Sequence, residues 1–113
     1  MPHTIIDASA QFKGKSKRGL YGDVVEEMDW NIGRILDELK ILNLDNNTYV
    51  IFISNNGPWY LDNHPKLSKY RGLGGSHGGD SFPLRGHKTS TWEGGLRVPL
   101  YRLGTTNTFW CNL

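Results

Sequence analysis

Thr48-Tyr-Val-Ile-Phe-Ile-Ser-Asn-Asn-Gly-Pro58 is the stretch of this 113-residue chain that decides the fold. Residues 48–53 are all β-branched or aromatic, which predicts a short central strand covered on both faces. Pro58 helps to end the strand, because proline has no N–H to donate to a neighbouring strand. In open α/β sheets, ligands bind beyond the carboxyl ends of the strands, which is where Asn55 and Asn56 follow this one. Their amide oxygens suit a hard cation, although a plain polar turn explains the same residues.

An amphipathic helix precedes this strand in the sequence. Over residues 17–42, apolar side chains recur at three- and four-residue spacing, which is typical of a helix with one apolar face. The apolar positions are Val24, Val25, Met28, Ile32, Ile35, Leu36, Leu39 and Leu42. A turn at residues 44–47 joins the helix to the strand, and this order of elements indicates an α/β fold. We therefore expect the apolar face, Ile35 included, to pack on strand 48–53.

The composition excludes several classes of function. The formal net charge of +2 is too small to predict binding to nucleic acid or to an anionic membrane surface. No apolar run approaches the ~20 residues of a membrane-spanning helix, and the first residues show no secretory signal. The single cysteine, Cys111, excludes an internal disulfide framework and a four-cysteine zinc site. Neither the compartment nor the oligomeric state follows from these features.

The second half of the chain is rich in glycine, basic residues and hydroxyl groups. Residues 59–82 predict a long Gly-rich loop, since its glycines neither follow a strand nor precede a helix. Residues 83–99 have a composition that suits an oxyanion, and Lys88 is a compact charge that can meet sulfate or phosphate. A further strand is expected over residues 96–101, at a sheet edge or a bulge because it contains Pro99.

Four segments occur along the chain in a characteristic order. They are Pro2-His3, Tyr21-Gly-Asp-Val-Val-Glu-Glu-Met-Asp-Trp-Asn-Ile-Gly33, Phe52-Ile-Ser-Asn-Asn-Gly-Pro58, and Leu84-Arg-Gly-His-Lys-Thr-Ser-Thr-Trp-Glu-Gly-Gly-Leu-Arg-Val-Pro99. Together they resemble the sulfatase family, the type I arylsulfatases of the alkaline phosphatase superfamily. That family usually reads Pro-His-x-Pro at the first segment, Ser-Asp-Asn-Gly-Pro at the third, and Leu-Arg-Gly-x-Lys-x-x-x-Trp-Glu-Gly-Gly-x-Arg-x-Pro at the fourth. The resemblance implies that residues 1–100 are a partial sulfatase catalytic domain of α/β class, with a divergent tail at residues 101–113.

The resemblance also implies hydrolysis of a sulfuric ester, with a sulfate-ester small molecule or glycan as substrate. By position, Asn55 and Asn56 match the family's calcium ligands. Lys88 matches its sulfate-binding lysine, and His3 matches the histidine beside the leaving oxygen. Asn55 stands where the family usually has aspartate, which removes one negative charge next to the metal.

The family's nucleophile is a formylglycine made in a Cys/Ser-x-Pro-x-Arg motif, and we expect it to be absent from this chain. Cys111 is followed by Asn112 and Leu113, and the family's paired N-terminal aspartates are missing too. The isolated chain, as an internal fragment, is therefore expected to be inactive. Two alternatives stay open: a fragment of a sister phosphodiesterase or phosphonate hydrolase, and a non-catalytic anion-binding module. The Trp92-Glu-Gly-Gly95 segment favours a sulfatase.

Overall fold

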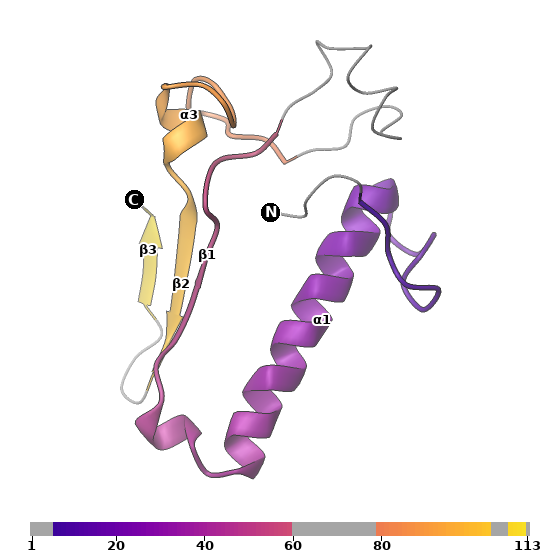
Figure 1. The fold of residues 1–113 in the computed structure, drawn as a ribbon, viewed down its shortest axis with the longest axis vertical. Coiled ribbons are helices and arrows are strands. Elements are labelled where there is room, and N and C mark those ends of the chain that lie inside the picture. The colour runs from indigo at the N-terminus through magenta and orange to yellow at the C-terminus, as the bar shows by residue number, and fades with distance from the viewer. Residues whose placement is uncertain (1–5, 60–78, 105–108, 113) are drawn as a thin grey trace.

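The computed structural model describes residues 6–59 and 79–104, together with the backbone of residues 109–112 (Figure 1). The elements in chain order are helix α1 (Gly19–Ile41), the 3₁₀ turn η1 (Asp45–Asn47), strand β1 (Val50–Ile53), the one-turn helix α3 (Glu93–Leu96), and strands β2 (Pro99–Leu103) and β3 (Phe109–Asn112). The predicted helix, turn and first strand are therefore confirmed, with ends that differ by one or two residues. The helix α3 was not expected.

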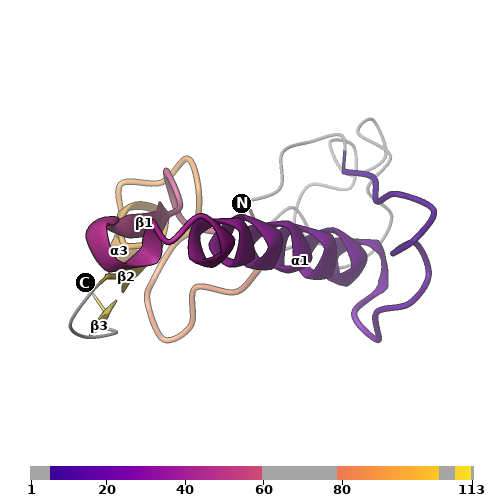
Figure 2. The same ribbon diagram turned by 90° about the horizontal axis from the view of Figure 1, so that it is seen from below.

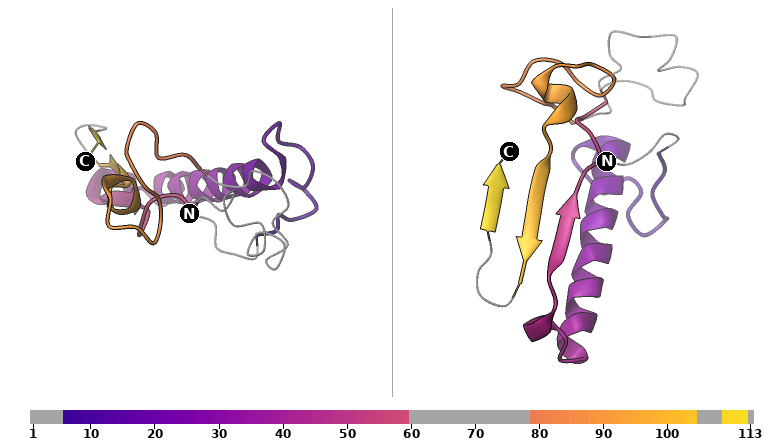
Figure 3. Two further views of the ribbon diagram at one scale, coloured as in Figure 1. Left: turned by 90° about the horizontal axis from the view of Figure 1, so that it is seen from above. Right: turned by 60° about the vertical axis from the view of Figure 1, so that its left-hand side comes forward.

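The three strands form one antiparallel sheet in the order β1-β2-β3, which the right-hand panel of Figure 3 shows. Val50 pairs with Leu103, and Ile53 pairs with Leu100. The strand expected over residues 96–101 is β2 at Pro99–Leu103, and it is the middle strand, so its predicted place at a sheet edge is wrong. Pro99 is the first residue of β2, a position at which proline is tolerated in a strand. Because β3 lies within residues 101–113, part of the segment expected to be a divergent tail joins the sheet.

The prediction of a central strand covered on both faces is wrong for the described part of the chain. β1 lies at an edge of the sheet, and its side chains alternate between half-buried and exposed. Val50 and Phe52 line the space between the sheet and α1. Ile51 and Ile53 point the other way and are 61% and 52% exposed. A continuous apolar run is suited to cover on two faces, whereas the described elements cover only one.

Helix α1 lies on one side of the sheet, nearest to β1 (Figures 1 and 2). Its half-buried stripe includes Val25, Met28, Leu36 and Leu39, in agreement with the predicted apolar face. Ile35 is 61% exposed, so its predicted place on the packed face is wrong. Within the residues that the structure describes, no helix combines the length and the apolar composition that a membrane crossing requires.

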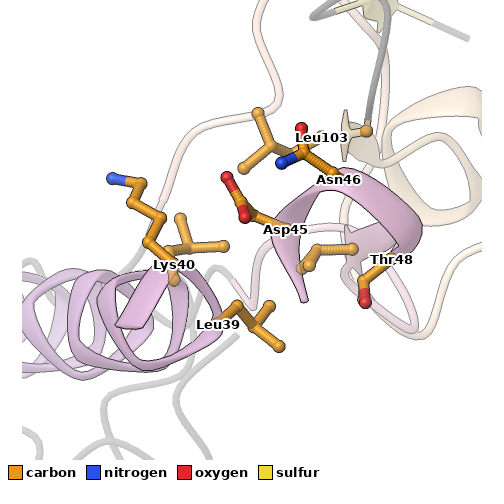
Figure 4. Close-up of a pocket in the computed structure, with 9 residues that line it drawn as sticks. Leu39, Lys40, Asp45, Asn46, Thr48 and Leu103 are labelled. Atoms are coloured by element: carbon orange, nitrogen blue, oxygen red, sulfur yellow. The ribbon is translucent and has the colours of Figure 1, made fainter. Parts of the chain in front are cut away.

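Among the residues that the structure describes, two cavities lie between α1 and the sheet. The larger one has a volume of about 700 Å³ and lies between Met28 of α1 and Phe52 of β1. The smaller one, of about 260 Å³, is lined by Leu39 and Lys40 of α1, Asp45 and Asn46 of η1, and Leu103 of β2 (Figure 4). Among the described elements, close backbone approach joins α1 only to η1. The predicted packing of the helix on the strand is therefore loose.

The buried apolar core of the described residues is small and lies near the start of α1. Ile6 and Ala8 are the buried hydrophobic side chains in this part of the chain. Ile6 packs against Leu20 and Val24 of α1 and against Trp59, which follows β1 and its turn. This cluster ties the amino-terminal segment to the first turns of the helix and to the segment that follows β1.

Asp23 holds the loop that precedes α1. Its side chain is 2% exposed, and its two carboxylate oxygens accept three backbone N–H groups. The donors are Gly14 at 2.8 Å, Lys15 at 3.0 Å and Ser16 at 2.7 Å. The hydrogen bond from Ser16, followed by that from Gly14, keeps the pKa of Asp23 below its ordinary value of 3.8 despite burial. The loop is thus folded around a charged carboxylate.

Replacing Asp23 with asparagine should destabilise the chain, because the amide N–H₂ then faces backbone N–H donors. Since the pKa of Asp23 is lower in the folded state, its stabilising effect is fully present above the unfolded pKa, near 3.8, and is lost as the pH falls through the folded pKa. We expect the urea midpoint, followed by helix circular dichroism, to be lower in Asp23→Asn and less sensitive to acid.

Asp7→Asn is the matched control for this measurement. A salt bridge of 2.7 Å to Lys13 also lowers the pKa of Asp7, but the Asp7 side chain is 63% exposed. Exposed ion pairs contribute little to stability, so this variant should keep the acid dependence of the original chain. The same acid dependence in Asp23→Asn and in the original chain would contradict the role given to Asp23.

Among the described strands, β1 has an open edge and an exposed outer face. These should make the chain self-associate, because exposed uncharged strand edges template pairing with other chains. We expect Ile51→Lys to reduce the average mass measured by light scattering over a concentration series. Ile35→Lys is the control, since Ile35 is equally exposed, at 61%, but lies on α1. Monomeric behaviour of the original chain, or equal effects of both variants, would rule out pairing through β1.

Candidate functional site

The segment that follows β1 forms a short turn at the carboxyl end of the strand. The Ser54 hydroxyl donates to the backbone oxygen of Asn56 at 2.9 Å. Asn55 is exposed, whereas Asn56 is half-buried. The Asn56 Oδ1 atom is buried and has no hydrogen-bond partner in the described part of the chain. An unpaired buried acceptor costs about 1–3 kcal/mol, and a cation bound at this oxygen would offset that penalty.

Residues 85–95 fold directly against this turn, and we name residues 54–58 together with 85–95 the junction. The Gly57 N–H donates to the Gly95 carbonyl at 2.9 Å, and the Lys88 N–H donates to the Pro58 carbonyl at 2.8 Å. A Cβ atom at Gly57 would collide with the backbone carbonyl of Gly94, so glycine is required for this close approach. The junction therefore holds Lys88 beside the end of β1.

Two cationic side chains of the junction lie over tryptophan rings. The Lys88 Nζ atom lies 5.3 Å from the centroid of the Trp59 ring, and the Arg85 Cζ atom lies 3.7 Å from that of Trp92. Such cation–π contacts stabilise a charged side chain while leaving it a donor to an anion. Trp59 in turn packs on Ile6 in the small core. The position of the Lys88 charge is thus linked to the core.

The larger cavity reaches this end of the strand. It is lined by Asn56, Ser54 and Ser81, and by Tyr21 of α1, whereas Lys88 does not line it. Burial raises the pKa of the Tyr21 phenol, because it disfavours the charged phenolate.

The structure thus brings two of the site residues predicted from the sequence, Asn56 and Lys88, to one end of β1. It does not place both in one cavity. Asn55 lies in the same turn as Asn56. His3 lies outside the described residues.

The donor set at Asn56 suits a hard cation only in part. An amide oxygen is a normal calcium ligand, and Asn56 Oδ1 has no other partner in the described residues. Within residues 6–59 and 79–104, no group of three His, Cys, Asp or Glu side chains gathers to hold a metal. Asn56 therefore fits the role of one calcium ligand.

The expected absence of a Ser-x-Pro-x-Arg motif is wrong as a statement about the sequence, because Ser81-Phe-Pro-Leu-Arg85 has that spacing. In the structure, the Ser81 hydroxyl donates to the Gly86 carbonyl at 2.6 Å, and Arg85 stacks on Trp92. The segment also follows β1 and leads directly into the loop of Lys88. These contacts give Ser81 a structural role in the turn that precedes Lys88.

The tight packing of Gly94 and Gly95 was not predicted from the sequence. A Cβ atom at Gly94 would collide with the backbone carbonyls of Gly86 and Arg85, and one at Gly95 would collide with that of His87. The two adjacent glycines after Trp92-Glu93 could have indicated this packing. Two glycines in a helical turn destabilise it, so their presence indicates a place where another backbone segment approaches closely.

Comparison with known proteins shows similarity to sulfatases over most of the chain. The family model described as Sulfatase matches residues 1–101. The chain is 42% identical over 97 residues to steryl-sulfatase of Homo sapiens, 44% over 100 residues to arylsulfatase H of Canis lupus familiaris, and 41% over 97 residues to N-acetylgalactosamine-6-sulfatase of Rattus norvegicus. Each comparison covers 86% of this chain but only 15% or 16% of the relative's length. The chain belongs to the sulfatase family, whose fold is of the alkaline-phosphatase-like α/β class.

Proposed function

We propose that this chain is the calcium- and sulfate-binding part of a sulfuric ester hydrolase. The junction carries the proposal, because it holds Lys88 at the same end of β1 as the Asn56 oxygen that has no partner among the described residues. The names of the three relatives point to different sulfate esters. The names support hydrolysis of a sulfuric ester as the reaction. Whether the substrate is a small molecule or a glycan has to be decided by experiment.

Lys88 is the proposed sulfate-binding residue. Its ammonium is a compact charge with three donors, which suits a tetrahedral oxyanion. Its backbone N–H is held by Pro58 and its Nζ atom by the Trp59 ring, so the side chain is oriented before an anion binds. Such preorganisation is how an enzyme stabilises charge that develops on a transferring group.

Asn56, with Asn55 beside it, is the proposed calcium-binding pair. Calcium held there supplies Lewis-acid polarisation of the sulfate oxygens. With Asn55 in place of the usual aspartate, the site offers one negative charge fewer, and its calcium affinity is correspondingly low. His3 is proposed to act at the leaving oxygen, as the histidine of the matching Pro-His segment does in the family.

Formylglycine is proposed to be absent from this chain, and hydrolysis then needs a nucleophile from elsewhere. Ser81 is the candidate precursor by spacing, but its hydroxyl is held by the Gly86 carbonyl. Without an activated nucleophile, positioning and charge remain while covalent catalysis does not.

Calcium affinity tests the metal half of the proposal. We expect a Kd on the order of 10⁻³ M by titration calorimetry, because the ligands are uncharged. Asn55→Asp should tighten binding by about tenfold through the added charge, and Asn56→Ala should abolish it. Asn46→Ala is the control, since Asn46 is an exposed amide in η1. Unchanged binding in Asn56→Ala would remove Asn56 from the site.

Sulfate binding and turnover test the other half. We expect sulfate to bind the chain and Lys88→Ala to lose this binding, with no hydrolysis of 4-nitrophenyl sulfate in either protein, with or without calcium. Intact mass should show an unmodified Ser81. Turnover that disappears in Lys88→Ala or Ser81→Ala would overturn the inactivity. Tighter binding of a phosphate diester or a phosphonate than of sulfate would favour the sister phosphodiesterases.

A further inference from the structure

Both backbone polar groups of Lys88 are held by neighbours. Its N–H donates to the Pro58 carbonyl at 2.8 Å, and its carbonyl oxygen lies 2.8 Å from Nδ1 of the His87 imidazole. A carbonyl oxygen only accepts, so Nδ1 carries the proton in this contact. We propose that His87 is a positioning residue for Lys88: its Nδ1–H holds the Lys88–Thr89 peptide and thereby the direction of the Lys88 ammonium. The inference rests on the proposed role of Lys88 in sulfate binding.

The peptide that His87 holds is strained. Thr89 has a φ of 78°, a left-handed conformation that is an outlier for a β-branched residue. Rotation of the Lys88–Thr89 peptide plane changes φ of Thr89 and ψ of Lys88, so it can relieve the strain. The same rotation turns the Lys88 carbonyl away from the imidazole and redirects the chain at Lys88. The hydrogen bond from His87 therefore opposes the rotation that the strain favours.

The other hydrogen bonds of this turn act at its ends. The Ser90 N–H donates to the His87 carbonyl at 3.0 Å, and the Ser90 hydroxyl donates to the same oxygen at 2.7 Å and accepts from the His87 N–H at 3.1 Å. None of these bonds involves the peptide between Lys88 and Thr89. Of the hydrogen bonds given for the described residues, the one that acts on the Lys88–Thr89 peptide is donated by the His87 imidazole.

The first test is the tautomer of the His87 ring, read from ring ¹⁵N shifts and two-bond N–H couplings of the full chain. In the neutral ring, we expect a proton on Nδ1, whereas a free histidine prefers Nε2. This readout does not depend on sulfate or calcium. An Nε2–H ring at His87 would overturn the proposal.

The second test follows the Lys88 side chain itself. Because Nζ lies 5.3 Å from the Trp59 ring centroid, the ε-protons of Lys88 should show an upfield ring-current shift. His87→Ala should reduce that shift. His87→Asn should restore it, since the asparagine amide can donate where Nδ1 does. His87→Ala combined with Thr89→Gly should also restore it, because glycine removes the strain. A shift that is unaffected by His87→Ala would refute positioning.

Sulfate affinity separates this proposal from the proposed function. We expect His87→Ala to weaken sulfate binding about 3- to 10-fold, the range of one net hydrogen bond, and His87→Asn to recover it. Lys40→Ala removes a cation at the far end of α1 and should change nothing. If Lys88→Ala loses sulfate binding and His87→Ala does not change it, the role of His87 is refuted and the sulfate site stands. If Lys88→Ala binds sulfate as well as the original chain does, the sulfate site is refuted. The tautomer of His87 and the ring-current shift of Lys88 then decide whether His87 positions Lys88.

Discussion

The backbone of Gly57 approaches that of Gly94 and Gly95 so closely that no Cβ atom fits between them. This approach joins the turn after β1 to the loop that carries Lys88, and the Gly57–Gly95 hydrogen bond of 2.9 Å fixes its register. The placement of Asn56, the stacking of Lys88 on Trp59 and the turn at His87 all depend on it. Side chains as small as alanine would separate the two segments and with them the two halves of the site.

Helix α1 and the position of β1 were predictable, because each follows from the spacing or run of apolar residues over a local stretch. The environment of β1 was not. An apolar run tells how much cover a strand needs, but not which elements supply it, so Ile51 and Ile53 were placed in a core that the described residues do not contain. Ile35 was misplaced for a related reason, since helical spacing defines a stripe but not its width.

In the site as well, contacts between residues far apart in the sequence could not be predicted from local patterns. Asn56 and Lys88 were paired by family resemblance, because no periodicity links residues so far apart in the chain. The contacts that orient them were outside the reach of sequence patterns. Adjacent glycines signal flexibility as readily as close approach, and neither the hydrogen bond from His87 to Lys88 nor that from Ser81 to Gly86 has a recognisable spacing. Ser81 is the opposite case. Its spacing matches a motif, but its hydroxyl already donates a hydrogen bond within the turn.

The two cavities beside α1 have a consequence for how the molecule opens. The amino-terminal half of α1 borders the larger cavity but is anchored by Asp23 and by the Ile6 cluster, while its carboxyl-terminal half borders the smaller cavity around Leu39 and Leu103. Stability in proteins is distributed among local cooperative units, and among the described elements the far end of the helix is joined by close backbone approach only to η1. That end can fray without disturbing the junction. Substitutions there then alter local opening while the geometry around Lys88 persists.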